Sequence, residues 1–496
     1  MEIQFEAKTC TCLETSHNKQ ILEKTQEHRL GDELPDVGKI LGCWGQTMIR
    51  SKENRGGEIG INGGILIGIL YVPDGGGAPC TISDWIPFSS RWDSNFTDSE
   101  GTILCRCNIQ SIDARSISAR KLMIRASICV QIQYCYKKEF PLYYPENVAE
   151  NIQMLKHSYP VQLPKEAGEK DFQIEETLEH LASDFYQLVY CTLHPQILEK
   201  KVMTDKLLFR GVCHLHFLYM TDEGLLKKSE IDLPFSQYNE LTGIYDADCS
   251  SLVQLSITGL ELGKNEEGIL QLNAGVVGEY TIYSKENITL VEDSYGIRMK
   301  VQCVREENKI PAILDSREQT IPVRINPEIE ALECLDAVFY PEQVAISGED
   351  NLTIKCYGSC LILYKDLEGQ LRSTWTRWES SETMESSQNN IVNGDVSYCG
   401  DLHWEISGTS VYLDTKLILH TMTQTSQGIT AVKSLVISDE PVETDFHRPS
   451  LIIRSAGTED LWHLAKSVGS TTEDISRING IGDSLNPDQL LLIPLL

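Results

Sequence analysis

The sequence predicts a mainly β protein with three tandem β-sandwich or barrel-like repeats and a small C-terminal βααβ domain. Three observations predict this fold. One strand-turn-strand pattern recurs at nearly equal intervals, apolar and polar residues alternate along most of the chain, and a short helical pattern between two apolar strands ends it.

The composition supports several folded domains and argues against binding to nucleic acid. With 496 residues, 41% of them hydrophobic, the chain exceeds the length at which single cores stop growing. The formal net charge is −29, and residues of both signs are scattered rather than gathered in a basic stripe. Such a chain repels phosphate backbones and anionic lipid, so neither nucleic acid nor a membrane surface is an expected partner.

The start of the chain and its cysteines predict a cytoplasmic protein. Charged residues from Glu2 to Glu14 interrupt the region where a secretion signal needs an unbroken apolar segment. No later stretch offers about 18 consecutive apolar residues, so we expect no direct membrane insertion. Most of the 16 cysteines lie in alternating apolar runs, such as Cys129, Cys213 and Cys360, which is typical of reduced core thiols.

The recurring pattern is an apolar strand that ends in tyrosine and is followed by a polar turn. The three strands are GINGGILIGILY, LFRGVCHLHFLY and IKCYGSCLILY, which end at Tyr71, Tyr219 and Tyr364. The intervals between these tyrosines are 148 and 145 residues. A second strand follows each turn and carries one marker aromatic residue: Phe88, Phe235 or Trp378. Strand, turn and strand in this order predict a β-hairpin.

Each hairpin is flanked by further apolar or alternating stretches. One precedes it, for example GKILGCWGQTMI, and a pair follows it, for example ILCRCNIQSIDA with KLMIRASICVQIQY. Five or six strands per repeat suffice for a β-sandwich or small barrel. Charged, proline-marked segments between the repeats are expected to be linkers. The expected boundaries are an N-terminal extension 1–29, β-domains 30–145, 175–297 and 323–438, linkers 146–174, 298–322 and 439–449, and a C-terminal domain 450–496.

The C-terminal segment predicts a strand, two helices and a strand. LIIRS and LLLIP have the apolar composition of strands, while Leu461 and Trp462 belong to an apolar helical face. STTE, residues 470–473, is a capping box that begins the second helix, which we expect to end at Asn479 with Gly480 as its left-handed stop.

This segment resembles a LysM domain. The motif of that family is present as GTEDLWHLAK, the helix-ending asparagine as Asn479, and the leucine-rich last strand as Leu490 to Pro494. The resemblance implies a shallow groove between two loops that binds N-acetylglucosamine chains. The residues that correspond to the groove are Gly457, Thr458, Glu459, Leu461, Asn479, Gly480 and Ile481.

The sequence departs from the LysM pattern at two positions near this groove, and the groove residues also have an alternative, purely structural interpretation. The first loop is one residue longer than the family pattern, and Asp488 stands where a glycine is common. Both changes argue against sugar binding and favour docking of a protein by the same fold. Alternatively, Leu461 and Trp462 belong to the core, and Asn479 with Gly480 forms only a helix C-cap.

The repeats resemble the SPOCS domain of spore coat-assembly proteins. The pattern is clearest in the first repeat, as LPDVGKIL, GGILIGILYVPDGG and WIPFSSRW. Three such domains followed by a LysM domain are similar to the SipL-like family of spore morphogenetic proteins. The resemblance implies a mother-cell cytoplasmic protein that helps to assemble and anchor the basal spore coat at the forespore surface. Its implied partners are the stage IV sporulation coat ATPase and other coat proteins, with the LysM domain as the docking module.

No motif in the sequence indicates catalysis or a cofactor. His214 and His216 would project to one side of a strand, as metal ligands sometimes do, but the other repeats have no ligands at the matching positions. The P-loop, zinc-protease and nucleophile-elbow motifs do not occur. We therefore expect no enzyme, no catalytic residue, no metal and no cofactor. The competing hypotheses are a peptidoglycan-binding protein of the cortex or cell wall and, third, an enzyme whose site the linear sequence does not reveal.

Overall fold

The computed structural model of the protein is built almost entirely from long antiparallel strands, and the expected mainly β fold class is confirmed. It describes residues 2–495 except for 95–99, 146–147, 149–150, 309–311, 349–350, 386–389, 426–428, 442–448, 483–484 and 487–488.

The first unit is a sandwich of two three-stranded sheets. One sheet is a meander of β3 (Val37–Arg55), β4 (Glu58–Pro73) and β5 (Cys80–Asp93), with β4 in the centre. The other sheet has β7 (Lys121–Tyr144) in the centre, flanked by β2 (Glu6–Arg29) and β6 (Thr102–Ser118). The apolar faces of the two sheets pack against each other, as period-two alternation requires.

The same strand order recurs in two further units. The second unit has the meander β9 (Gln187–Met203), β10 (Lys206–Met220), β11 (Leu226–Glu240) and the sheet β8 (Ile152–Thr177), β13 (Leu270–Gly296), β12 (Ser250–Lys264), with α1 (Glu179–Ala182) between β8 and β9. The third unit has the meander β16 (Glu333–Ser347), β17 (Asn351–Lys365), β18 (Leu371–Glu385) and the sheet β15 (Ala312–Ile325), β20 (Ser410–Thr425), β19 (Asn390–Ser407).

Segments that we expected to be an N-terminal extension and linkers are strands in the structure. Residues 1–29 contain β2, residues 146–174 contain most of β8, and residues 298–322 contain most of β15. Each is the edge strand that completes the second sheet of its unit. An edge strand tolerates proline and has one solvated face for charges, and these were the two features that predicted a linker. Of the linker expected at 439–449, residues 442–448 lie outside the described part of the chain.

Each of the three marker aromatics packs on a glycine in the central strand of its meander. Phe88 lies opposite Gly63, Phe235 opposite Gly211, and Trp378 opposite Gly358. At all three glycines a Cβ atom would collide with the aromatic ring and with a carbonyl oxygen of the first strand. The aromatic pattern read from the sequence therefore marks one repeated packing arrangement, in which the ring covers a side-chain-free position.

The first strand of each meander also has a β-bulge at the same place. The strands opposite Tyr71, Tyr219 and Tyr364 each contain one extra residue, which is Leu41, Val189 or Leu335. The residues that follow these bulges are Gly42, Tyr190 and Asp336. A bulge twists a strand and redirects the next side chains, so the three units present these positions in the same way.

The three units pack against one another in a closed ring rather than in a row. Trp44 of the first unit stacks on Tyr190 of the second, with ring centroids 4.7 Å apart. Lys228 of the second unit lies 3.7 Å from the ring centroid of Trp404 in the third. Gln110 of the first unit donates a 2.9 Å hydrogen bond to the carbonyl of Glu342 in the third, which closes the ring. One hydrophobic cluster includes residues from all three units.

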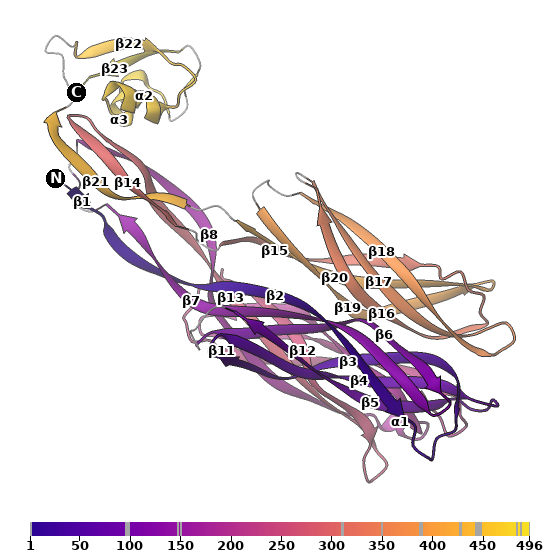
Figure 1. Ribbon diagram of the computed structural model, residues 1–496. Helices are drawn as coiled ribbons and strands as arrows, with labels where there is room; N and C mark the ends of the chain where they lie inside the picture. Colours follow the sequence, from indigo (N-terminus) through magenta and orange to yellow (C-terminus); the bar gives the residue numbers. More distant parts are fainter. Residues whose placement is uncertain are drawn as a thin grey trace.

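A β-stalk projects from this ring. β2, β7, β8 and β13 run beyond their sandwiches into it (Figure 1). There β21 (Ile429–Pro441) pairs with both β14 (Met299–Asn308) and the N-terminal β1 (Glu2–Gln4). Strands from both ends of the chain thus lie side by side, and the C-terminal module sits at the far end of the stalk (Figure 1).

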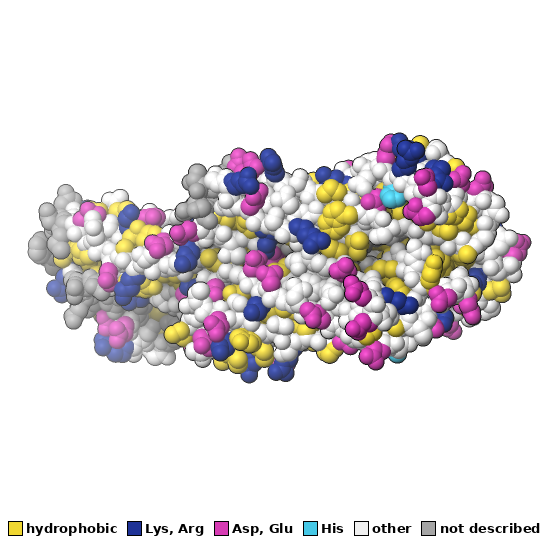
Figure 2. Space-filling model, turned by 90° about the horizontal axis from the view of Figure 1, so that it is seen from below, with side chains coloured by type: hydrophobic (Ala, Val, Ile, Leu, Met, Phe, Trp, Pro, Cys, Tyr) yellow, Lys and Arg dark blue, Asp and Glu magenta, His cyan; other side chains and the backbone are white. Residues whose placement is uncertain are grey.

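The surface carries charges of both signs. Figure 2 shows acidic and basic side chains interspersed over one face, with apolar patches between them. In the part of the chain that the structure describes, no helix is long and apolar enough to cross a membrane.

Candidate functional site

The C-terminal module consists of β22 (Leu451–Ser455), α2 (Leu461–Val468), α3 (Thr472–Asn479) and β23 (Leu490–Pro494). Asp460 caps α2 by accepting a hydrogen bond from the His463 amide. The cap of α3 is Thr471, which accepts from the Asp474 amide, and not Ser470 as the capping-box reading predicted. Ser470 is buried, and its hydroxyl donates a hydrogen bond to the carbonyl of Pro494. The left-handed stop at Gly480 is confirmed, with φ at 62°.

The two loops expected to form a groove lie at one end of the β22–β23 pair, since the Ala456 amide donates to the carbonyl of Gln489. Gly457, Thr458 and Gly480 are exposed, and space is open where a Cβ would lie at either glycine. Glu459 is held 2.8 Å from Arg454 by an ion pair. Asp488, the other departure from the LysM pattern, lies outside the described residues.

The remaining expected site residues have structural contacts. Leu461 is 4% exposed and belongs to the module core, while Ile481 packs partly buried against that core. Asn479 joins α3 to β23, because its side-chain amide donates to the Leu492 carbonyl at 2.7 Å and its Oδ1 accepts from the Leu492 amide at 2.8 Å. A partner could thus contact fewer residues than the expected set, and these residues lie in the two loops.

The module is anchored to the end of β13 by contacts that the sequence did not reveal. Trp462 Nε1 donates to Asp293 Oδ2 at 3.0 Å, Lys466 Nζ lies 2.5 Å from the same oxygen, and the Tyr295 hydroxyl donates to the Ser470 carbonyl at 2.7 Å. Burial opposes the ionisation of Asp293, but hydrogen bonds from Lys466 and Trp462 outweigh it and lower the pKa of this carboxyl. The carboxylate is therefore charged and fixes the module on the stalk.

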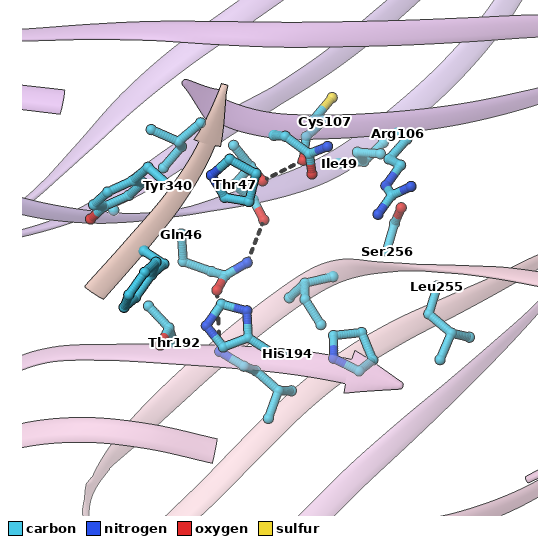
Figure 3. A pocket seen from close by; sticks show the side chains of 18 of the residues that line it. Gln46, Thr47, Ile49, Arg106, Cys107, Thr192, His194, Leu255, Ser256 and Tyr340 are labelled. Carbon is cyan, nitrogen blue, oxygen red and sulfur yellow. Dashed lines mark hydrogen bonds between the residues drawn. The ribbon is translucent and has the colours of Figure 1, made fainter. Parts of the chain in front are cut away.

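A second candidate site is a polar cavity of about 150 Å³ where the three units meet (Figure 3). Each unit contributes its first meander strand, with Gln46, His194 and Tyr340 among the lining residues. Gln46 accepts a hydrogen bond from the Leu193 amide, and Thr47 donates to the Cys107 carbonyl, so much of the polar lining serves the contacts between strands. Burial, followed by the nearby His216 and His214, lowers the pKa of His194 to about 3, and its ring is neutral.

Beside this cavity a buried polar network joins the second and third units. His216 Nε2 lies 2.9 Å from Asp336 Oδ1, and the Tyr190 hydroxyl donates to Asp336 and lies 3.3 Å from His216 Nε2. Burial would raise the pKa of Asp336, but the charge and hydrogen bond of His216 and the hydroxyl of Tyr190 hold it below its ordinary value. The network is a buried contact between units, since Tyr190 and His216 belong to the second unit and Asp336 to the third.

The paired histidines do not converge on a metal site. His214 instead contacts Asp232 at 2.7 Å and Gln196 at 3.1 Å. No group of three or more His, Cys, Asp or Glu side chains that could hold a metal ion occurs among the described residues. The 15 cysteines whose side chains are described are free thiols, most of them buried, and burial raises the pKa of Cys213 to about 12. Such thiols are unreactive core residues.

Two anchoring residues interrupt an apolar pattern in the sequence. Asp336 interrupts the apolar run LDAVFY, and Asp293 lies in LVEDSYG between apolar strand residues. An acidic residue in an apolar strand needs a partner when it is buried. The signal indicates a buried contact but not which distant residue provides it.

A comparison with protein families finds a match for part of the second unit. The family described as SipL, SPOCS domain matches residues 184–262, which contain β9, β10, β11 and most of β12. No curated protein and no solved structure matches the chain. The second unit thus carries a SipL-type SPOCS domain, which indicates a sporulation-related protein.

Proposed function

We propose that this chain is a non-enzymatic scaffold for assembly of the basal spore coat. The match of residues 184–262 to the SipL SPOCS domain carries the proposal. The recurrence of its strand order in the first and third units supports three SPOCS-like units. A scaffold role also agrees with the contact between His216 and Asp336, because both side chains are buried and join the second unit to the third.

The partners and location that we propose come from the resemblance of the whole chain to SipL-like proteins. The scaffold would bind the stage IV sporulation coat ATPase and other coat proteins in the mother-cell cytoplasm, at the forespore surface. Its docking module would be the C-terminal module, as a LysM-type fold. Support comes from the exposed positions Thr458 and Gly480, on a module that Trp462 fixes to the stalk.

A pull-down from sporulating cells tests the docking proposal. We expect the full-length chain to recover the coat ATPase, and Thr458→Arg to reduce recovery by at least tenfold because the bulky cation blocks the loop surface. Glu473→Arg, at an exposed position in the first turn of α3, is the matched control and should recover the wild-type amount. Recovery of other coat factors without the ATPase would contradict the proposed partner.

A fluorescent fusion tests the location. A ring of fluorescence around the forespore is the expected result, and it separates a coat scaffold from a wall protein in one observation. Fluorescence spread evenly through the mother cell throughout sporulation would overturn the scaffold proposal.

The second candidate function is peptidoglycan binding. One observation favours it: Gly457 and Gly480 leave an open backbone surface, and LysM domains hold sugar chains largely through backbone groups. In the same loop, however, Glu459 forms an ion pair with Arg454 of β22, which argues for protein docking rather than sugar binding at this surface. Calorimetric titration of the full-length chain with a chito-oligosaccharide distinguishes the two, since micromolar binding would favour the glycan function.

A further inference from the structure

The polar cavity where the three units meet is lined by one equivalent position from each unit. Gln46, His194 and Tyr340 line it, on the first meander strands β3, β9 and β16. Each of the three stands five residues after the extra residue of the shared bulge. The cavity therefore has equivalent backbone segments on three sides but a different side chain from each unit.

The contacts between the units follow the same cyclic order. β12 of the second unit lies against β3 of the first, β19 of the third against β9 of the second, and β6 of the first against β16 of the third. β6, β12 and β19 hold the same place in their sheets, and all three contribute residues to the cavity. The cavity thus lies on an approximate threefold axis, where a bound molecule contacts all three units.

The charge of the lining favours a negatively charged ligand. Asp and Glu make up 72 of the 496 residues of the chain, yet none of the described residues that line the cavity is acidic. Arg106 of β6 brings a positive charge to the lining, and its side chain extends toward Ser256 of β12 (Figure 3). A guanidinium binds carboxylate and phosphate oxygens through paired N–H donors.

Neutral donors line the cavity beside this arginine. Asn108 and His194 each carry an N–H group that can donate to an anion. His194 adds a donor without a charge, because burial, followed by the nearby His216 and His214, lowers its pKa to about 3. Arg106, Asn108 and His194 are each partly exposed, so a solute can reach this part of the cavity from solvent.

The volume of the cavity limits the size of the ligand. Its volume of about 150 Å³ equals the share of about five water molecules in the liquid. Pockets for drug-sized ligands begin at roughly 300 Å³. A phosphate ion or a short carboxylate is small enough for this space, whereas a nucleotide or a sugar chain is too large.

We propose that the cavity on this axis binds one small oxyanion, a phosphate or a short carboxylate, held by Arg106. The anion contacts all three units and stabilises their ring, since a ligand that binds only the folded state opposes unfolding. This site goes beyond the proposed function and is separate from the C-terminal loops that we propose as the docking surface.

Thermal unfolding of the purified full-length chain tests the site at constant pH, with phosphate or acetate added in separate titrations up to about 50 mM. Sodium chloride keeps the ionic strength constant, because salt also screens the repulsion within a chain whose net charge is −29. At least one anion should raise the melting temperature in a saturable way, with an apparent dissociation constant near or below about 1 mM. A melting temperature that depends on ionic strength alone would overturn the proposal.

Variants of two arginines on the same strand locate the bound anion. Arg106→Gln should weaken binding at least about tenfold, because a hydrogen bond to a charged group is lost. Arg106→Lys keeps the charge without the paired donors and should weaken binding less. Arg115→Gln is the matched control, since Arg115 is exposed and pairs with Asp113 outside the cavity, and it should bind like the wild type. Equal losses in Arg106→Gln and Arg115→Gln would show a general electrostatic effect and contradict the proposal.

A second position keeps the test decisive if Arg106→Gln does not fold, which thermal unfolding without added anion verifies. His194→Leu removes a neutral donor from the lining and should weaken binding about threefold or more. Isothermal titration calorimetry measures the loss and should give one anion per wild-type chain. Unchanged binding in His194→Leu and in every folded Arg106 variant would place the anion outside the cavity and overturn the proposal.

Discussion

At the residue scale, one structural position has three different side chains that determine how the units meet. After the shared bulge stand Gly42, Tyr190 and Asp336. Asp336 of the third unit places a carboxylate at the contact between the second and third units. There it forms an ion pair with His216 and accepts a hydrogen bond from Tyr190, both of the second unit. Because each unit has a different residue here, the contact between the second and third units is specific to that pair.

We expect His216→Leu to destabilise the protein by about 3–5 kcal/mol, because the charge of Asp336 is left buried without its partner. Leucine stands at the matching position of the third unit, Leu361, so its size is compatible with the strand. Urea denaturation measures the change. The double variant His216→Leu/Asp336→Asn should regain part of the loss.

The pair His214 and Asp232 provides a matched control on the same strands. Their ring and carboxylate are 2.7 Å apart, but the Asp232 side chain is 72% exposed. Asp232→Asn should therefore cost less than about 1 kcal/mol. Equal costs at the buried and exposed pairs would refute the role assigned to burial.

The neutral His194 predicts a loss of stability on acidification. Its pKa is about 3 in the folded protein and about 6.5 when unfolded, so the unfolded chain binds the extra proton between these values. The free energy of unfolding should fall as the pH drops below about 6.5, by up to about 1.4 kcal/mol per pH unit. His194→Gln should remove this contribution, which urea denaturation at about pH 7 and about pH 5 would detect as a shallower slope. Identical slopes for both proteins would contradict the prediction.

At the scale of elements, each sandwich depends on a strand that precedes its hairpins. β2, β8 and β15 carry the charges of a connecting segment, and β8 and β15 also its prolines, yet each of the three forms the edge of a sheet. The glycine and aromatic pair of each meander is the second recurrent feature, and it joins the central strand to the third strand. The edge strand and the glycine–aromatic pair explain why the same strand order recurs in three units whose other side chains differ.

Gly211→Ala should be strongly destabilising, by about 1–3 kcal/mol or more, because the new Cβ overlaps the carbonyl of Gln196 and lies 2.7 Å from the Phe235 ring. Gly263→Ala on β12 is the control, since no atom lies within 4 Å of its Cβ position. It should be neutral or stabilising by up to about 1 kcal/mol. Thermal unfolding compares the two, and similar melting temperatures would contradict the packing role of Gly211.

At the scale of the whole molecule, the ring and the stalk give the C-terminal module a defined place. The three units contact one another through Trp44, Lys228 and Gln110, and strands from both chain ends close the stalk. The module lies at the end of the stalk away from the ring (Figure 1), where Trp462 contacts Asp293. Its free surfaces are thus presented to partners from a rigid base.

Asp293→Ala should release the module from the stalk, because Trp462 and Lys466 lose their shared acceptor. Small-angle X-ray scattering should then show a larger radius of gyration. Asp293→Asn keeps an acceptor for Trp462 and should give an intermediate result. An unchanged radius in the alanine variant would show that the packing and hydrogen bond of Tyr295 hold the module without Asp293.

The sequence alone determined the features that have a local cause. Alternation with a period of two predicted the strands, the tyrosine and aromatic spacing located the hairpins, and Gly480 marked the end of a helix. The same local signals misassigned β8 and β15, since proline and charge in an edge strand cannot be distinguished from those in a linker without the neighbouring strand. The contacts of Asp336 with His216 and of Asp293 with Trp462 depend on how the chain folds in three dimensions. These contacts join residues more than a hundred positions apart, and the sequence pattern around a buried charge reveals its need for a partner but not the partner's position in the chain.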